Sequence, residues 1–230
     1  MSNYDYKGFY RRNLPHLQPL GGTLFITCCL AGSLPQSTLE WYEREKANLV
    51  RQSVNLKGSE RAERELKLQR RWFARIEGAL HKAETGPLCL KDPQVAKLVN
   101  DALHFHDGKM YRLDAFCIMP NHVHLIVMPL EFRKKEADAS EQDLNSRRII
   151  DPEYYSISRI THSFKGYTAS ECNRILKRKG EFWLHESYDH AIRDSQGWER
   201  VLAYVINNPV KAQLVQEWRD WPYTYVKDPM

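Results

Sequence analysis

The chain has 230 residues, of which 42% are hydrophobic and 11% aromatic, which excludes a disordered or collagen-like chain. Its 34 lysine and arginine residues exceed its 29 aspartate and glutamate residues, and the net charge of +5 permits a polyanionic partner without establishing one. No run approaches the ~18–20 apolar residues of a membrane helix. The first residues lack the apolar stretch of a signal peptide, so we expect a cytoplasmic protein with no membrane partner.

The first part of the chain predicts an irregular arm over 1–20, one buried strand and a long charged helical segment. Residues 24–30 follow a glycine pair and form an apolar, partly β-branched run, which predicts the strand. Residues 38–83 carry apolar side chains at helical spacing within a heavily charged background. Basic side chains between Arg61 and Arg75 either contact phosphate or form a solvated face with glutamates, and we favour the second interpretation.

The second part of the chain predicts alternating helices and strands. In chain order these are a helix at 93–106, strands at 111–119 and 122–128, a helix at 153–178, an extended segment at 183–193 and a helix at 196–207. Residues 131–152 lose nearly all apolar character, which predicts a mobile loop. We therefore expect one α+β domain over 1–230, with an antiparallel sheet and helices on one side of it.

Two histidines carry the first chemical signal. His122 and His124 are two apart on a predicted strand, so both imidazoles point to one face and converge on one metal ion. A second pair, His104 and His106, lies on a predicted helix. Positions two apart diverge there by about 200°, since a helix has ~3.6 residues per turn, so we expect surface residues.

A tyrosine and an asparagine on a later helix carry the second signal. Tyr204 and Asn208 are four apart, so a phenol and an amide project from the same helix face. Alone, the pair is typical of a core tyrosine followed by a helix-terminal asparagine. Asn207, one residue earlier, shares the direction of Tyr204 less well and stays an alternative to Asn208.

Taken together, the two motifs resemble the REP-associated tyrosine transposases, part of the HUH single-tyrosine transposase family. The resemblance implies a ferredoxin-like HUH fold around a central antiparallel sheet. It also implies that His122 and His124 bind a divalent metal, Mg²⁺ or Mn²⁺, that Tyr204 is the catalytic nucleophile, and that Asn208 is the third metal ligand. Many family members carry glutamine at that last position, so the shorter asparagine can instead coordinate through water.

Further strings support the resemblance, which covers residues 20–30 and 95–225. They include Met119-Pro120-Asn121 before the histidines, Asn208-Pro209-Val210-Lys211 after the tyrosine, and the segment 188–194. The charged segment 38–85 lies outside it, and we predict that this segment is a helical insertion.

The resemblance implies an enzyme that nicks and rejoins single-stranded or hairpin DNA in DNA transposition. A free tyrosine, with a pKa near ~10, is a poor nucleophile at neutral pH, and a cation beside the phosphate would favour its attack. The alternatives are a DNA-binding protein of transposase descent that no longer cuts and, less well matched, a histidine-triad hydrolase, whose third histidine position is Ile126 here. We expect a monomer or homodimer.

Basic and aromatic side chains before and after residue 180 are candidates for holding the DNA. Helix charge balance and core packing are the competing interpretation of most of them. The candidates are Lys165, Arg174, Lys177, Arg178, Lys179, Trp183, His190 and Arg193.

Overall fold

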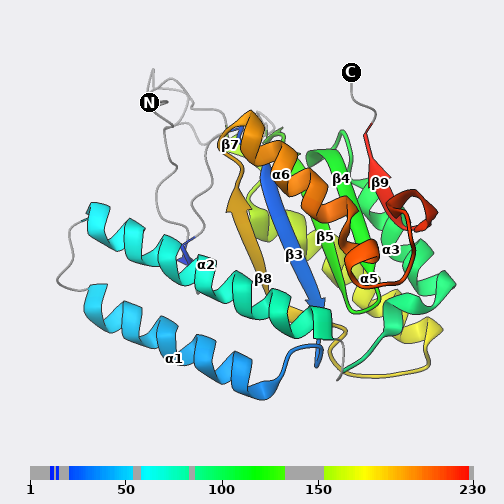
Figure 1. Ribbon diagram of the computed structural model, residues 1–230, viewed down its shortest axis with the longest axis horizontal. Helices are drawn as coiled ribbons and strands as arrows, with labels where there is room; N and C mark the ends of the chain where they lie inside the picture. The colour runs from blue at the N-terminus through cyan, green and yellow to red at the C-terminus, as the bar shows by residue number, and fades with distance from the viewer. Residues whose placement is uncertain are drawn as a thin grey trace, which may run out of the picture.

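A five-stranded antiparallel sheet forms the centre of the computed structural model (Figure 1). The structure describes residues 11–12, 14–15, 21–53, 58–82, 86–132 and 153–227. Neighbouring strands of this sheet are antiparallel throughout. In spatial order the strands are β8 (Trp183–Ala191), β3 (Leu24–Leu30), β5 (His122–Pro129), β4 (Tyr111–Met119) and β9 (Thr224–Val226).

The chain passes through the sheet in the order β3-α3-β4-β5-α5-β8, with β9 added at one edge. Helices α3 (Pro93–Phe105) and α5 (Ile157–Ile175) contact each other and pack on the same face. This is the βαββαβ arrangement of ferredoxin-like folds, with the first and third strands of the unit side by side at its centre. The predicted fold class, α+β with a central antiparallel sheet, is confirmed.

The sheet is buried on both faces. Along β3, Leu24 and Ile26 pack under α3 and α5, whereas Phe25 and Cys29 belong to a second apolar cluster on the opposite face. The prediction of helices on one side only is therefore wrong. Figure 1 shows α2 (Gly58–Lys82) and α6 (Ser195–Ile206) on the second face. Burial on both faces explains why the sequence of β3 is an almost continuous run of apolar residues.

The charged segment forms a helical hairpin of α1 (Gln36–Ser53) and α2. The two helices pack through Tyr42 and Trp72, whose rings stack with centroids 4.1 Å apart. On the exposed side Arg71 pairs with Glu45 at 3.0 Å and Arg75 lies 4.2 Å from the Trp41 ring centroid. The apolar stripe of this amphipathic hairpin covers the second face of the sheet.

Side-chain caps fix where three helices begin. Asp92, Ser156 and Asp194 accept hydrogen bonds from the first turns of α3, α5 and α6. The helix predicted to end at residue 207 stops at Ile206, and a separate single turn, α7 (Asn208–Lys211), follows. A break at this point is expected because Pro209 has no amide proton to continue the helix.

The segment at 183–193, expected to be short extended chain, forms the nine-residue strand β8 over most of its length. The predicted loop at 131–152 lies outside the described residues except at its start. The remaining short elements are β1 (Arg11–Arg12), β2 (Leu14–Pro15), η1 (Cys89–Lys91), β6 (Glu131–Phe132), β7 (Glu153–Tyr154) and η3 (Trp218–Asp220). Of the helices in the described ranges, none is long and apolar enough to cross a bilayer.

Candidate functional site

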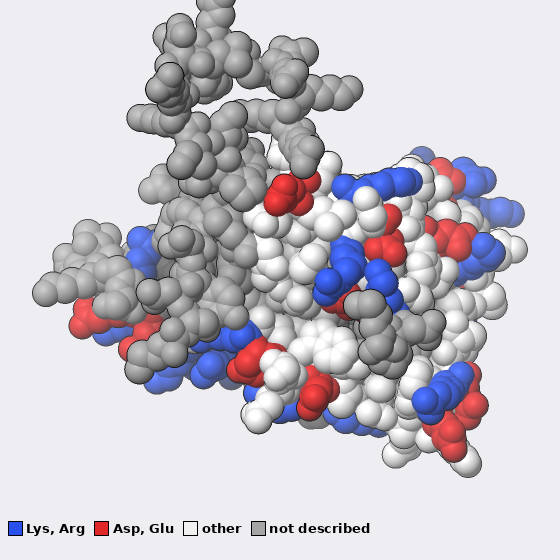
Figure 2. All heavy atoms as spheres, turned by 90° about the horizontal axis from the view of Figure 1, so that it is seen from above, with Lys and Arg blue, Asp and Glu red and all other residues white. Residues whose placement is uncertain are grey.

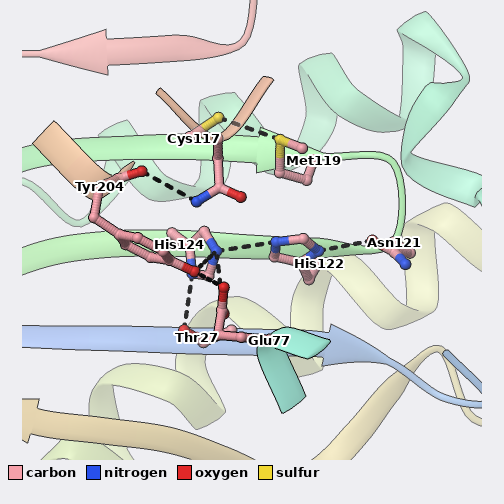
Figure 3. Close-up of polar contacts among 9 residues, drawn as sticks. Thr27, Glu77, Cys117, Met119, Asn121, His122, His124 and Tyr204 are labelled. Carbon is pink, nitrogen blue, oxygen red and sulfur yellow. Dashed lines mark hydrogen bonds and ion pairs between the residues drawn. The ribbon is translucent and has the colours of Figure 1, made fainter. Parts of the chain in front are cut away.

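The histidine pair lies at the start of β5, on the face covered by α2 and α6. The alternation of the strand places His122 and His124 on that face, and both are buried. Their Nε2 atoms are 3.0 Å apart (Figure 3). The structure thus brings the two predicted metal ligands together with the same ring nitrogen of each facing the other.

The other nitrogen of each ring is held by a neighbouring side chain. Nδ1 of His122 lies 2.7 Å from the Asn121 amide oxygen, and Nδ1 of His124 lies 2.8 Å from the Thr27 hydroxyl. An Nδ1 that donates to an oxygen leaves Nε2 as the nitrogen with a free electron pair. Metal-binding histidines are usually oriented in this way by a partner on their second nitrogen.

Tyr204 reaches the histidine pair from α6. Its hydroxyl lies 3.4 Å from Nε2 of His124, across 80 positions of sequence. The Tyr204 ring packs edge-on against Phe25 and Phe73 at centroid distances of 5.8 and 5.9 Å, and the Lys211 ammonium lies 4.9 Å from its centroid. These contacts fix the direction of the phenol toward the imidazoles.

Glu77 of α2 is a site residue that the sequence motifs did not reveal. Its carboxylate accepts a hydrogen bond from the Tyr204 hydroxyl, and its other oxygen lies 3.8 Å from Nε2 of His124 (Figure 3). Burial raises the pKa of this carboxyl to about 7, and Lys211 opposes the shift. One signal was available: positions 73, 76, 77 and 80 form an apolar helical stripe, and Glu77 is its charged member.

Asn208, the predicted third ligand, is buried beside the pair. Its amide nitrogen donates to the Tyr204 main-chain carbonyl at 3.1 Å. With His122 it lines a small cavity of about 90 Å³, large enough for water to bridge them. Asn207, the alternative, donates its amide to the Ala203 carbonyl within α6.

The donor set fits a divalent ion. Two Nε2 electron pairs facing each other at 3.0 Å repel unless a proton or cation lies between them. Imidazole, amide and carboxylate donors together suit a borderline ion such as Mn²⁺ as well as Mg²⁺. Within the described residues no group of three or more histidine, cysteine, aspartate or glutamate side chains gathers as a metal cluster. Ligation beyond the pair therefore requires a side-chain movement or water.

Six of the predicted DNA-binding residues lie around α5, which packs on the opposite face. The Lys165 ammonium donates to main-chain carbonyls and a serine hydroxyl of β8. The buried Trp183 indole donates to a threonine of α5, and Arg174 pairs with a glutamate of the same helix. Arg178 donates to a main-chain carbonyl. The other two follow the C-terminal end of α5 and are Lys177 and Lys179.

The remaining two, His190 and Arg193, lie on the histidine face. They line a cleft of about 430 Å³ with Tyr188, Arg70 of α2 and Arg200 of α6. Burial lowers the pKa of His190, which favours a neutral ring at neutral pH. The DNA-binding role of all eight residues stays a prediction. The cleft adds Arg200, which no motif had indicated, and Arg70, from the basic run for which a solvated face was the favoured interpretation.

Three comparisons place the chain among known proteins. It is 29% identical over 115 residues to a Haemophilus influenzae protein provisionally named a REP-associated tyrosine transposase, with 48% of this chain and 56% of that protein aligned. An uncharacterized protein of the same organism is 29% identical over 99 residues, or 43% of this chain and 54% of that protein. The chain thus spans about half the length of the curated relatives it matches.

A solved structure of a REP-associated tyrosine transposase bound to a REP hairpin is 16% identical and has a TM-score of 0.49, with 94% of this chain and 81% of that chain covered. No family model matches. The similarity of this chain to REP-associated tyrosine transposases, predicted from its two motifs, is confirmed by the comparison of sequences.

Proposed function

We propose that the protein is a divalent-metal-dependent enzyme of DNA transposition that nicks and rejoins single-stranded or hairpin DNA through Tyr204. The observation that carries the proposal is the 3.4 Å approach of the Tyr204 hydroxyl to the buried histidine pair. Two motifs far apart in sequence meet at one point, and these are the motifs on which the resemblance to the REP-associated tyrosine transposases rests. A tyrosine that only packed the core would not need a pair of oriented imidazoles beside its hydroxyl.

The proposed step is a transesterification at phosphorus. The Tyr204 hydroxyl loses its proton as its oxygen forms a bond to phosphorus, the bond from phosphorus to the 3′ oxygen breaks, and that oxygen gains a proton, so that the number of protons is unchanged. A 5′-phosphotyrosine link and a free 3′-hydroxyl result. Because the link keeps the energy of the ester, attack by a 3′-hydroxyl rejoins the strand without ATP.

Each side chain of the site has a defined part in this step. His122 and His124 would hold the ion, while Asn121 and Thr27 fix the orientation of their rings. When bound, the ion would withdraw charge from a non-bridging phosphate oxygen. The aromatic contacts of Tyr204 restrict the phenol to the direction of attack.

The arginine-lined cleft is the proposed path of the DNA strand. Phe25 separates it from the site, with its ring centroid 5.3 Å from His190 on the cleft side and 5.8 Å from Tyr204. Arg70 of α2, Arg200 of α6 and Arg193, which lies between β8 and α6, would supply charge for phosphates. Figure 2 shows acidic and basic side chains interspersed over the described part of one face, so charge on that face is not of one sign.

Covalent trapping tests the proposal. The protein is mixed with Mn²⁺ and labelled hairpins from the DNA that flanks its own gene, and the products are separated on a denaturing gel. We expect a slow-migrating protein–DNA band that Tyr204→Phe abolishes while hairpin binding on a native gel persists. The matched control is Tyr167→Phe, since Tyr167 is 56% exposed on α5 and remote from the histidines, and it should trap DNA normally.

Other outcomes have equally direct meanings. Binding by the wild type without any covalent band would favour a DNA-binding protein that no longer cuts. A covalent band of full intensity in Tyr204→Phe would refute the assignment of the nucleophile.

A further inference from the structure

Glu77 lies between the proposed nucleophile and the histidine pair. One carboxylate oxygen, Oε2, accepts the Tyr204 hydroxyl, and the other, Oε1, faces Nε2 of His124 at 3.8 Å. Figure 3 shows the carboxylate beside the Tyr204 hydroxyl and His124. One side chain from α2 thus contacts both halves of the site, although α2 belongs to the segment that the motifs do not cover.

The distances suit a shared ion. Atoms bound about 2.1 Å from one octahedral ion lie about 3.0 Å apart at right angles and about 4.2 Å apart when opposite. The two Nε2 atoms are 3.0 Å apart, which matches neighbouring ligands. The 3.8 Å between Nε2 of His124 and Oε1 of Glu77 falls between the two spacings. A change of less than 1 Å in this one distance would match either spacing.

Its chemistry also makes the Glu77 carboxylate a better third ligand for the ion than the side-chain amide of Asn208. Carboxylate oxygens are preferred ligands of Mg²⁺ and Mn²⁺, and imidazole alone does not favour either ion. Asn208 donates its amide nitrogen to the Tyr204 carbonyl, so the ligand atom it offers is a neutral amide oxygen, which attracts a divalent ion less strongly than a carboxylate oxygen does. A single negative ligand would leave a divalent ion one positive charge with which to attract the phosphodiester.

The position of Glu77 on the α1–α2 hairpin also favours a role as a metal ligand. Its side chain is 14% exposed and lies on the apolar stripe of α2 between Phe73 and Leu80. Burying a carboxylate in such a place is unfavourable unless positive charge compensates it, and a divalent ion would add to the compensation that Lys211 supplies. We propose that Glu77 is the third protein ligand of the divalent ion, so that the α1–α2 hairpin supplies part of the metal site.

This inference rests on the proposed function, and a metal titration separates the two. Binding of Mn²⁺ to the full chain is measured by calorimetry and by the electron paramagnetic resonance signal of free Mn²⁺, without DNA. We expect Glu77→Gln, which keeps the shape of the side chain, to weaken Mn²⁺ binding by about tenfold or more, and Glu77→Asp to recover part of the loss. Asn208→Ala should change the affinity less than Glu77→Gln does.

Two further variants complete the design. Glu63→Gln removes an exposed carboxylate from the same helix and should bind Mn²⁺ like the wild type. His124→Ala should abolish binding. Circular dichroism and the melting temperature of each metal-free variant show whether it is folded.

Each result decides one of the two proposals. If His124→Ala abolishes binding while Glu77→Gln binds as tightly as the wild type, the ligand assignment is overturned and the histidine centre stands. If Asn208→Ala then shows the larger loss, Asn208 is the third ligand. If His124→Ala leaves binding unchanged, or the wild type binds no Mn²⁺, the metal centre itself is refuted and Glu77 with it.

Discussion

The imidazoles of the candidate site are oriented by side chains outside the proposed metal and DNA contacts. Thr27, on β3, lies opposite His124 in the register of the sheet, and its hydroxyl is 2.8 Å from Nδ1 of that ring. Strand pairing therefore places the orienting group as firmly as the ligand itself. Asn121 holds His122 from the tight turn between β4 and β5. A site built this way has little freedom to rotate its ligands.

This dependence predicts the effect of removing one hydroxyl. Thr27→Val keeps the volume of the side chain but leaves Nδ1 of His124 without its partner on β3. We expect Mn²⁺ affinity and the cleavage rate to fall about 10–100-fold, the usual effect of losing such an outer contact. We also expect the free energy of unfolding to fall by about 1–3 kcal/mol, because the ring nitrogen is buried.

Metal titration and urea denaturation of the same variant measure the two effects. Thr161→Val is the matched control: that hydroxyl is also buried but donates to a carbonyl of its own helix, α5. It should leave Mn²⁺ affinity unchanged. Equal losses in both variants would show that the effect is general destabilisation rather than orientation of His124.

At the scale of elements, three segments converge on the cleft beside the candidate site. The residues just after β8, the exposed side of α2 and the first turns of α6 each bring one arginine to it. Sequence reasoning found Arg193 because it lies in a string typical of the family. It included Arg70 only in the basic run between Arg61 and Arg75, for which a solvated face was the favoured interpretation, and it did not indicate Arg200. The proximity of these two arginines arises only when α2 and α6 pack side by side on the sheet.

The cleft predicts a separable DNA-binding defect. Arg70→Ala removes one cation that would contact phosphate, so hairpin affinity should fall and the slope of log affinity against log salt should shrink by about 0.7–0.9. Mn²⁺ binding should not change, because Arg70 is not among the residues proposed to hold the ion, which are His122, His124 and Glu77. Fluorescence anisotropy at several salt concentrations measures both quantities.

Arg64→Ala is the control for this experiment. Arg64 lies on the same helix but pairs with Gln52 of α1 at 2.8 Å, outside the cleft. Its loss should leave the salt slope as it is in the wild type. If the two variants lose affinity equally, the DNA does not follow the cleft and the exposed side of α2 as a whole is the better candidate.

At the scale of the whole molecule, the sequence was informative where local pattern determines structure. The alternation of His122 and His124, the Asp92 cap and Pro209 each act within a few residues, and the elements they define are present. The second face of the sheet was missed because part of its cover, beside that from α6, comes from α1 and α2 (Figure 1). Their charged background gave no sign that Trp72 and Ile76 pack against a strand near residue 25. The role of Glu77 was not predicted for the same reason, because it lies among the many charged residues of α2.

The residues that precede and follow the α1–α2 hairpin lie close together in space. Gly86, just after it, has φ of +110°, and a Cβ there would lie 2.5 Å from the Gly32 carbonyl oxygen and 2.9 Å from the Ser33 Cα. Only glycine accepts that backbone angle and that close approach. The two ends of the segment thus meet, as expected for an insertion between β3 and α3 that leaves the ferredoxin-like unit unbroken.

This geometry permits excision of the hairpin by joining Ser33 to Gly86. The strain of the new connection should be small, but Phe25, Cys29 and Ile126 would lose the apolar stripe that covers them. Each large apolar side chain that becomes exposed forfeits about 1.5–3 kcal/mol. We therefore expect a lower urea midpoint, binding of a hydrophobic dye and, if Glu77 is a ligand, Mn²⁺ affinity no better than that of Glu77→Gln. An excised chain as stable as the wild type would mean instead that the second face of the sheet needs no cover, and that α1 and α2 serve the catalytic site alone.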